Sequence, residues 1–199
     1  MSNRSDNFDR TDGTIGGTTP SDGGSTWTSG GDAQIKSNQL GSVTSGAARN
    51  WAKLEASASN GTAQVTAKVL AAGTGMGLLV RMADATNYIG AYIYSGKLEL
   101  YKRVAGAFTA LGSTYTGTIS VNDVITLDVT SGSALTVKQN GTTRITATDS
   151  TGSTNTGVGF DWFQGDPSLR VDDFSWTDAA AATTSIPAIR AFPRAVLNF

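Results

Sequence analysis

Hydrophobic residues alternate with polar or small residues along four stretches of the chain: residues 76–82, 88–94, 97–104 and 124–130. Side chains of a β-strand point to opposite faces in turn, so this period of two predicts strands with one buried face. In the first stretch the alternation places Val80 and Met82 on one face and Arg81 on the other. In the second stretch three tyrosines share a face: Tyr88, Tyr92 and Tyr94.

Shorter apolar stretches are also predicted as strands: residues 34–40, 63–70, 107–111, 135–139, 142–147, 158–162 and 169–176. Turn residues separate the stretches. Ser95-Gly96 and Asn140-Gly141 each form a two-residue link between alternating stretches, and Gly and Asn take the positive φ of such turns at low cost. No long stretch has the period of an amphipathic helix. The pattern therefore predicts an all-β fold, an antiparallel sandwich or jelly roll.

Three segments depart from this pattern. Residues 11–31 are rich in Gly, Ser, Thr and Asp, and we expect an ordered, irregular loop held by Trp27. Residues 178–185 consist mostly of small side chains and are predicted to link a domain at 1–177 to a C-terminal arm at 186–199. The two prolines of the arm argue against a continuous helix and against a central strand.

The arm is too apolar to be exposed to water along its whole length, so it either folds back on its own domain or docks onto another subunit. We favour docking, by adding a strand to a sheet edge or by filling a groove. The residues expected to bind the partner are Pro187, Ile189, Phe192, Pro193, Val196, Leu197 and Phe199.

Composition excludes several kinds of chemistry. The 199 residues contain no Cys and no His, which removes disulfides, thiolate metal sites and the Ser–His pair of many hydrolases. The formal net charge is −1, so charge gives no reason to expect a nucleic acid or a membrane as partner. The first ten residues lack the apolar run of a signal peptide, and synthesis in the cytoplasm is expected.

Several short motifs, taken in order, resemble one domain family. Asp6-Asn7-Phe8-Asp9-Arg10, followed by Asp12-Gly13, Gly16 and Trp27, resembles the opening of concanavalin A-like lectin/glucanase (LamG-type) domains. Gly77-Leu78-Leu79-Val80-Arg81 with Asn87-Tyr88-Ile89 is similar to a strand pair of that superfamily. Lys97-Leu98-Glu99-Leu100 and Asn140-Gly141 fit the strands that follow. Asp172-Asp173-Phe174 resembles its closing strand, so the resemblance covers about residues 6–177.

The resemblance implies a concanavalin A-like jelly roll, a form often met in minor tail proteins of actinobacteriophages. In a sandwich whose two ends pair, we expect Phe8 and Phe174 to enter the core side by side while the neighbouring acids face outward. No cofactor is expected, although related domains often hold a structural calcium ion. Such a site would draw oxygens from Asp6, Asp9 or Asp12 together with Asp172 or Asp173.

Catalysis is not expected. Glucanases of the superfamily place two Glu and an Asp on one strand, whereas this chain has only Glu55 and Glu99, far apart in sequence. Carbohydrate binding is more credible, because sugars stack on aromatic rings beside planar polar groups. The candidate glycan-binding residues are Arg81, Tyr88, Tyr92 and Trp162, although rows of tyrosine also simply pack on sheet faces. Trp51 and Trp176 are expected in the core or at its rim.

The sequence thus leads to three hypotheses. The first is a non-enzymatic bacteriophage virion protein, a minor tail or head-decoration protein, that displays a lectin-like domain and binds other virion proteins through its arm in a symmetric assembly. The second is a carbohydrate-binding module for a glycan of the host surface. The third is a glycoside hydrolase.

Overall fold

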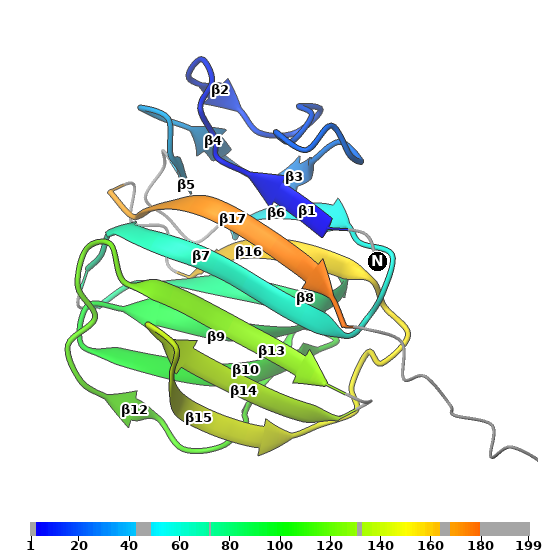
Figure 1. Cartoon of the computed structure of the whole chain (residues 1–199), viewed down its shortest axis with the longest axis vertical. Coiled ribbons are helices and arrows are strands. Elements are labelled where there is room, and N and C mark those ends of the chain that lie inside the picture. Colours follow the sequence, from blue (N-terminus) through cyan, green and yellow to red (C-terminus); the bar gives the residue numbers. More distant parts are fainter. Residues whose placement is uncertain (1–2, 43–48, 72, 131–132, 164–167, 180–199) are drawn as a thin grey trace, which may run out of the picture.

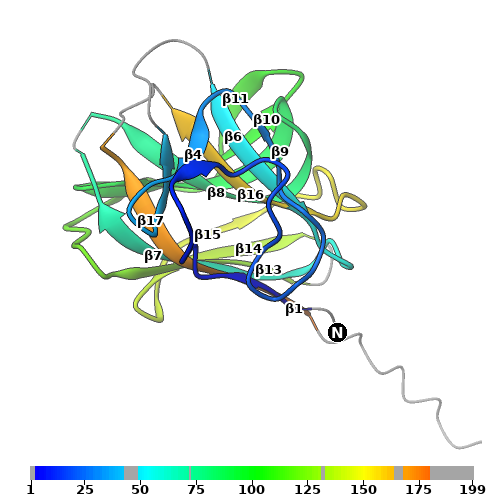
Figure 2. The ribbon, with the colours of Figure 1, turned by 90° about the horizontal axis from the view of Figure 1, so that it is seen from above.

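The computed structural model describes residues 3–42, 49–71, 73–130, 133–163 and 168–179, and these residues form strands, turns and irregular segments (Figure 1). No helix in this part of the chain is long and apolar enough to cross a membrane. The strands form two layers that pack face to face, as Figure 2 shows from above. The predicted all-β sandwich is therefore confirmed.

One layer, which we call the front sheet, lies nearest the viewer in Figure 1. Its strand order in the described residues is β15 (Thr142–Thr148), β14 (Ala134–Gln139), β13 (Val124–Thr130), β7 (Gly61–Val69), β17 (Arg170–Asp178), β5 (Leu40–Ser42), β4 (Ala33–Ile35) and β2 (Gly13–Thr14). β1 (Asn3–Asp6) also pairs with β17. All of these pairings are antiparallel.

The other layer is the back sheet. Its order in the same residues is β11 (Ala107–Ala110), β10 (Lys97–Val104), β9 (Asn87–Tyr94), β8 (Gly75–Asp84), β16 (Gly157–Phe163), β6 (Asn50–Glu55) and β3 (Thr28–Gly30), and β12 (Tyr115–Thr116) pairs with β10. Its strand pairs are also antiparallel.

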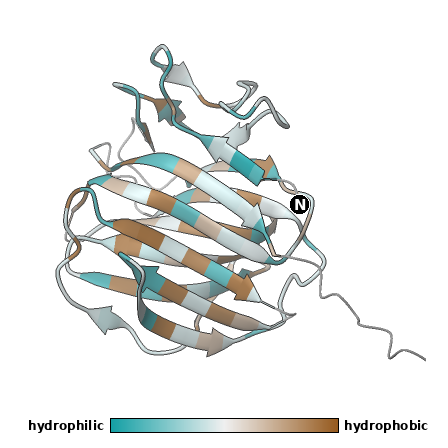
Figure 3. Ribbon diagram, viewed as in Figure 1, coloured by the Kyte–Doolittle hydropathy of each residue, from teal (hydrophilic) through white to brown (hydrophobic). Residues whose placement is uncertain are grey.

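The predicted alternation is visible along the strands of the front sheet, where apolar bands alternate with pale or polar ones (Figure 3). In β13, Ile125, Leu127 and Val129 are fully buried between the sheets, while the residues between them are partly exposed. Burial of a large aliphatic side chain contributes about 1.5–3 kcal/mol, so a core of this kind supplies most of the driving force for folding.

The predicted tight turns are present. Asn140 and Gly141 link β14 to β15 with φ values of 50° and 77°, as expected of a two-residue hairpin turn. Ser95-Gly96 links β9 to β10 and pairs Tyr94 with Lys97. Residues 34–40, predicted as one strand, instead form the hairpin of β4 and β5, because the chain reverses at Ser37 and Asn38, both with positive φ.

A β-bulge in β8 corrects a second prediction. Arg81 has a φ of 51°, and the register between β8 and β9 shifts between Val80 and Asp84. The extra residue reverses the alternation, since a bulge places two residues opposite one. Met82 therefore packs on the outer face of the sheet with Leu79, and not on the core face with Val80.

Aromatic rings fill the core where the N-terminal segment meets both sheets. The ring centroid of Trp27 lies 6.1 Å from that of Phe8 and 5.6 Å from that of Phe174, and Phe160 lies 5.3 Å from Phe174. Trp27 is 1% exposed, so it does hold the irregular segment in place as predicted.

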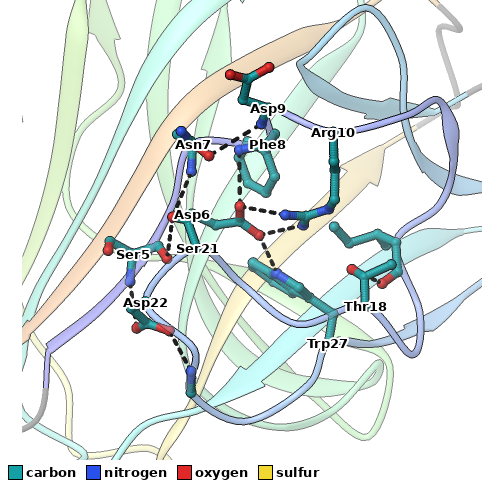
Figure 4. A network of polar contacts seen from close by, with 12 residues as sticks. Ser5, Asp6, Asn7, Phe8, Asp9, Arg10, Thr18, Ser21, Asp22 and Trp27 are labelled. Atoms are coloured by element: carbon teal, nitrogen blue, oxygen red, sulfur yellow. Dashed lines mark hydrogen bonds and ion pairs between the residues drawn. The ribbon is translucent and has the colours of Figure 1, made fainter.

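The expectation that the neighbouring acids face outward is wrong for Asp6, which is fully buried. Its carboxylate accepts hydrogen bonds from the Phe8 backbone N–H at 2.9 Å, from Trp27 Nε1 at 2.7 Å and from two nitrogens of Arg10 (Figure 4). A buried charge needs such partners. The Asp6–Arg10 motif of the sequence thus fastens the N-terminal segment to the core.

Trp176 and Trp51 lie as expected, with Trp176 fully buried and Trp51 partly buried on the back sheet. β17 continues through Asp178, whose carboxylate accepts a hydrogen bond from Trp176 Nε1 at 2.7 Å. Residues 186–199, the predicted docking arm, lie outside the described residues.

Candidate functional site

The outer face of the back sheet, directed away from the core, carries a second cluster of large side chains. It consists of Leu79, Met82, Tyr88, Tyr92 and Tyr94, with Trp51 and Tyr101 packed against it. Exposed faces of antiparallel sheets usually carry small or charged residues. A layer of tyrosines on this face therefore needs an explanation.

A buried carboxylate lies in the middle of this cluster. Val158, Phe160 and Trp162 of β16 point into the core, so Asp161 points outward. The strand pairing places Asp161 opposite Gly77, and Gly77 opposite Tyr92. Asp161 is nevertheless only 1% exposed.

Four donors satisfy the Asp161 carboxylate. Arg49 donates from Nε at 3.1 Å and also from Nη2, Tyr92 donates its hydroxyl hydrogen at 2.8 Å, and Tyr88 also donates its hydroxyl hydrogen. The two tyrosine hydroxyls lie 3.0 Å apart. Charge-assisted hydrogen bonds of this kind are about twice as strong as neutral ones, so the network fixes both rings.

The electrostatics of the cluster follow from burial and from Asp161. Burial, and then the Asp161 charge, raise the pKa values of Tyr88 and Tyr92 above the usual range of a phenol. Burial, and then Glu99, likewise raise the pKa of Tyr94. Burial opposes the charged form of Arg49, but Asp161 outweighs it and raises the pKa of the guanidinium. At neutral pH the cluster thus holds neutral phenols around one ion pair.

Glycines allow the tyrosine rings to lie over the sheet. A Cβ atom on Gly77 would lie 3.1 Å from Cζ of Tyr92, and one on Gly75 would lie 2.6 Å from Cε1 of Tyr94. A Cβ atom on Gly90 would lie 2.6 Å from Cδ2 of Leu79. Any larger residue at these positions would push the side chains of the layer away from the backbone.

The tyrosine layer forms the floor of a hollow of about 180 Å³, lined by Tyr92, Tyr94, Tyr101 and Phe108. Phe108 is 37% exposed and stands on β11, with its ring at 89° to that of Tyr101 and a centroid distance of 6.0 Å. Pockets for drug-sized ligands usually enclose about 300–1,000 Å³, so this hollow suits a smaller group such as one sugar ring.

A second ion pair lies on the outer face of the same sheet, on β10. Glu99 on β10 pairs with Tyr92 in the register, and its carboxylate accepts a hydrogen bond from Lys97 Nζ at 2.8 Å. The hollow is thus flanked by two carboxylates, each with a cationic partner.

Of the glycan-binding candidates predicted from the sequence, some lie at this site and others do not. Tyr88 and Tyr92 lie at the site, but they are 1% and 2% exposed, and their hydroxyls bind Asp161. Trp162 is fully buried in the core on the opposite face of the sheet from Asp161. A side chain between the sheets cannot contact a ligand on the outer face.

The buried Arg81 side chain is also engaged in contacts within the protein. It is 1% exposed and donates to the carbonyl oxygens of Ser59 and Asp149 at 3.3 and 3.1 Å, and to Oδ1 of Asn60 at 2.8 Å. Burial lowers its pKa, against the opposing charge of Asp149. Arg81 thus joins two loops to the β8 bulge and does not face the hollow.

Tyr101 and Phe108 are not among the ligand candidates predicted from the sequence, and neither Arg49 nor Asp161 was predicted to support a site. The register of the Ser95-Gly96 hairpin indicates that Tyr101 shares a face with Tyr92, and the alternation of β16 indicates that Asp161 faces outward. Arg49 reaches Asp161 across 112 positions of sequence, for which no local pattern gives a signal.

The calcium alternative receives no support from geometry. Within the described ranges, no three His, Cys, Asp or Glu side chains lie close enough together to hold a metal ion. Asp6, one of the proposed ligands, is engaged by Arg10 and Trp27.

Solved structures with the same architecture were found. A carbohydrate-binding module, CBM66 from Bacillus subtilis, superimposes with a TM-score of 0.56 at 17% identity, covering 75% of this chain and 92% of that one. A β-glucanase from Bacillus licheniformis gives 0.56 at 11% identity, with 90% and 99% covered. The carbohydrate recognition domain of Emp46p gives 0.56 at 9% identity, with 78% and 89% covered.

The chain has a concanavalin A-like jelly-roll fold. The fold predicted from the short sequence motifs is therefore confirmed. No protein-family model matches the sequence, and no curated protein matches it. At identities of 17% or less, the likeness of this concanavalin A-like domain to the solved structures is one of fold.

Proposed function

We propose that this concanavalin A-like domain binds a carbohydrate, without catalysis, in the hollow on the outer face of the back sheet. The observation that carries the proposal is the aromatic lining of the hollow by Tyr92, Tyr94, Tyr101 and Phe108. Aromatic faces bury the apolar C–H surface of a sugar, while nearby polar groups bind its hydroxyls.

The support beneath the hollow favours binding over accidental packing. Tyr92 is fixed through Asp161, and Tyr101 contacts both Tyr92 and Phe108 with ring centroids 5.9 and 6.0 Å apart. A site whose rings are already fixed loses little conformational entropy when it binds. Two solved structures of similar fold, a carbohydrate-binding module and a carbohydrate recognition domain, support this proposal.

The absence of catalysis is part of the proposal. Glycosidases need two carboxyl groups that flank the scissile bond about 5–9.5 Å apart, one of them free to donate a proton. Asp161 is 1% exposed and accepts bonds from two tyrosines and Arg49, and Glu99 is paired with Lys97. We expect no release of reducing sugar from any glycan that the protein binds.

Screening on a glycan array followed by calorimetry tests the proposal. We expect Phe108→Ala to weaken binding about tenfold or more, equivalent to about 1.4 kcal/mol, because the exposed wall of the hollow is lost. Val69→Ala is the matched control, since Val69 is 38% exposed and belongs to the front sheet. Equal binding by the two variants, or no glycan bound by the native chain, would overturn the proposal.

The bacteriophage role remains a separate proposal, carried by the sequence alone. It depends on the apolar residues of 186–199, which lie outside the described residues. Deletion of 186–199 should leave a folded domain that binds glycan but no longer joins a virion. Incorporation of the truncated chain into particles at the native level would contradict a docking role for this segment.

A further inference from the structure

Three cationic side chains lie on the aromatic rings around the hollow. Lys97 Nζ lies 4.5 Å from the centroid of the Tyr94 ring. The guanidinium carbons of Arg49 and Arg103 lie 4.7 and 5.1 Å from the centroid of Phe108. A cation within about 6 Å of a ring centroid is attracted to the face of the ring. The walls of the hollow therefore hold positive charge in fixed places.

The two ion pairs beside the hollow have their cations outward. In the pair of Arg49 with Asp161, the arginine side chain is 20% exposed and the aspartate side chain 2%. In the pair of Lys97 with Glu99, the corresponding fractions are 38% and 12%. A ligand that approaches this face meets the cations before the carboxylates.

Arg103 differs from the other two cations because it forms no ion pair among the described residues. It donates from Nε to the carbonyl oxygen of Gly106 at 3.1 Å and from a second nitrogen to the carbonyl oxygen of Ala85. Within the described part of the chain, its Nη2 atom makes no hydrogen bond. The two hairpins that meet here thus hold the Arg103 guanidinium in place and leave its Nη2 atom able to donate to a ligand.

We propose that the hollow takes a sugar that carries an anionic group, a carboxylate or a sulfate, and that Arg103 binds this group. The proposal rests on the carbohydrate-binding function above and names the class of sugar. The Nη2 atom of Arg103 can donate charge-assisted hydrogen bonds to carboxylate or sulfate oxygens, while the sugar ring contacts Tyr101 and Phe108. The chain as a whole has a net charge of −1, so general attraction to polyanions does not account for such binding.

The test is calorimetry with oligogalacturonate, which has one carboxylate on each sugar, and with its fully methyl-esterified form, which has the same backbone and no charge. A sulfated galactan oligomer and its desulfated form are the second pair of probes. In about 0.15 M salt, where long-range attraction is screened, we expect at least one charged probe to bind about tenfold more tightly than its neutral partner.

Arg103→Gln should remove this preference, and Arg103→Lys should retain part of it, because the charge is kept and the planar fork is lost. Lys138→Gln is the matched control. It also removes one positive charge, but from the outer face of the front sheet, where Lys138 pairs with Asp128 at 2.6 Å. Circular dichroism of each variant shows whether the fold is kept.

The possible results separate the two proposals. A preference for a charged probe that Arg103→Gln removes and Lys138→Gln keeps supports the inference, and the pair that shows it identifies the anionic group. Equal binding of charged and neutral probes, or equal losses in the two variants, overturns the inference and leaves carbohydrate binding in place. Binding of neutral glycans alone on the array would likewise overturn the inference and leave carbohydrate binding in place. Failure of every glycan to bind overturns both.

Discussion

Two buried aspartates in this molecule have similar partners and different surroundings. Asp6 and Asp161 are 0% and 1% exposed, and each is paired with one arginine and bound by the side chain of at least one aromatic residue. Around Asp6 the aromatic partner is Trp27, which is itself buried in the core. Around Asp161 the partners are tyrosines, and one of them, Tyr92, forms part of the hollow.

The difference shows that a buried carboxylate can hold either a chain segment on the core or side chains at the surface. The Asp6 carboxylate also accepts a hydrogen bond from the backbone N–H of Phe8, and this network holds the N-terminal segment on the core (Figure 4). The Asp161 carboxylate instead binds the hydroxyls of Tyr88 and Tyr92, and so fixes rings on the outer face of the back sheet. We therefore expect substitutions at the first site to affect folding and substitutions at the second to affect binding.

The largest effect is expected from Asp6→Ala. Removal of the carboxylate leaves Arg10 without its partner and Trp27 Nε1 buried without an acceptor, and breaking a buried pair in this way usually costs about 3–5 kcal/mol. Urea denaturation measures the free energy of unfolding. Asp9→Ala is the control, because Asp9 is exposed, and a similar stability for the two variants would show that the Asp6 network is not needed.

Asp161→Ala should destabilise the protein less and impair glycan binding more. Arg49 is partly exposed and can turn toward water, so we expect a loss of about 1.5–3 kcal/mol, the usual contribution of hydrogen bonds to a charged group. The rings of Tyr88 and Tyr92 lose their common acceptor, and the floor of the hollow loosens. Calorimetry on the folded variant should show weakened binding. If the variant binds as the native chain does, Asp161 does not support the site.

The smallest effect is expected from alkaline pH. The pKa of Tyr92 is raised in the folded state, so between about pH 9 and 10.5 this phenol ionises in the unfolded chain only, and stability falls as the pH rises. Tyr92→Phe removes this contribution. Between the two pH values its free energy of unfolding should therefore fall by about 1 kcal/mol less than that of the native chain. Urea denaturation at both pH values measures the difference, and an unchanged loss would mean that Tyr92 ionises normally in the fold.

The sequence predicted the sandwich because its local signals agree with one another. The alternation of residues 88–94 and 97–104 and the Ser95-Gly96 turn fix the pairing of Tyr92 with Glu99 without knowledge of the rest of the fold. The alternation of residues 76–82 was misleading beyond Arg81, because a bulge reverses the faces and no residue type marks its position.

The candidate site was predicted less well than the fold. Tyr88 and Tyr92 were found because they repeat along one strand, whereas Phe108 contributes a single ring from another strand and Arg49 comes from a distant segment. The sequence predicts Trp162 as a ligand contact because sugars stack on tryptophan, but its neighbour Asp161 is the residue on the outer face. Contacts between distant segments of the chain determine which residues form the site, and no local sequence pattern reports them.

The most direct test of the binding site is an aromatic NMR spectrum recorded while the protein is titrated with a glycan identified on the array. We predict that the ring resonances of Tyr101 and Phe108 shift as the site fills, while those of Trp27 beside Asp6 do not. Saturation with glycan while the Tyr101 and Phe108 resonances stay unchanged would contradict the account, because the ligand would then be bound elsewhere.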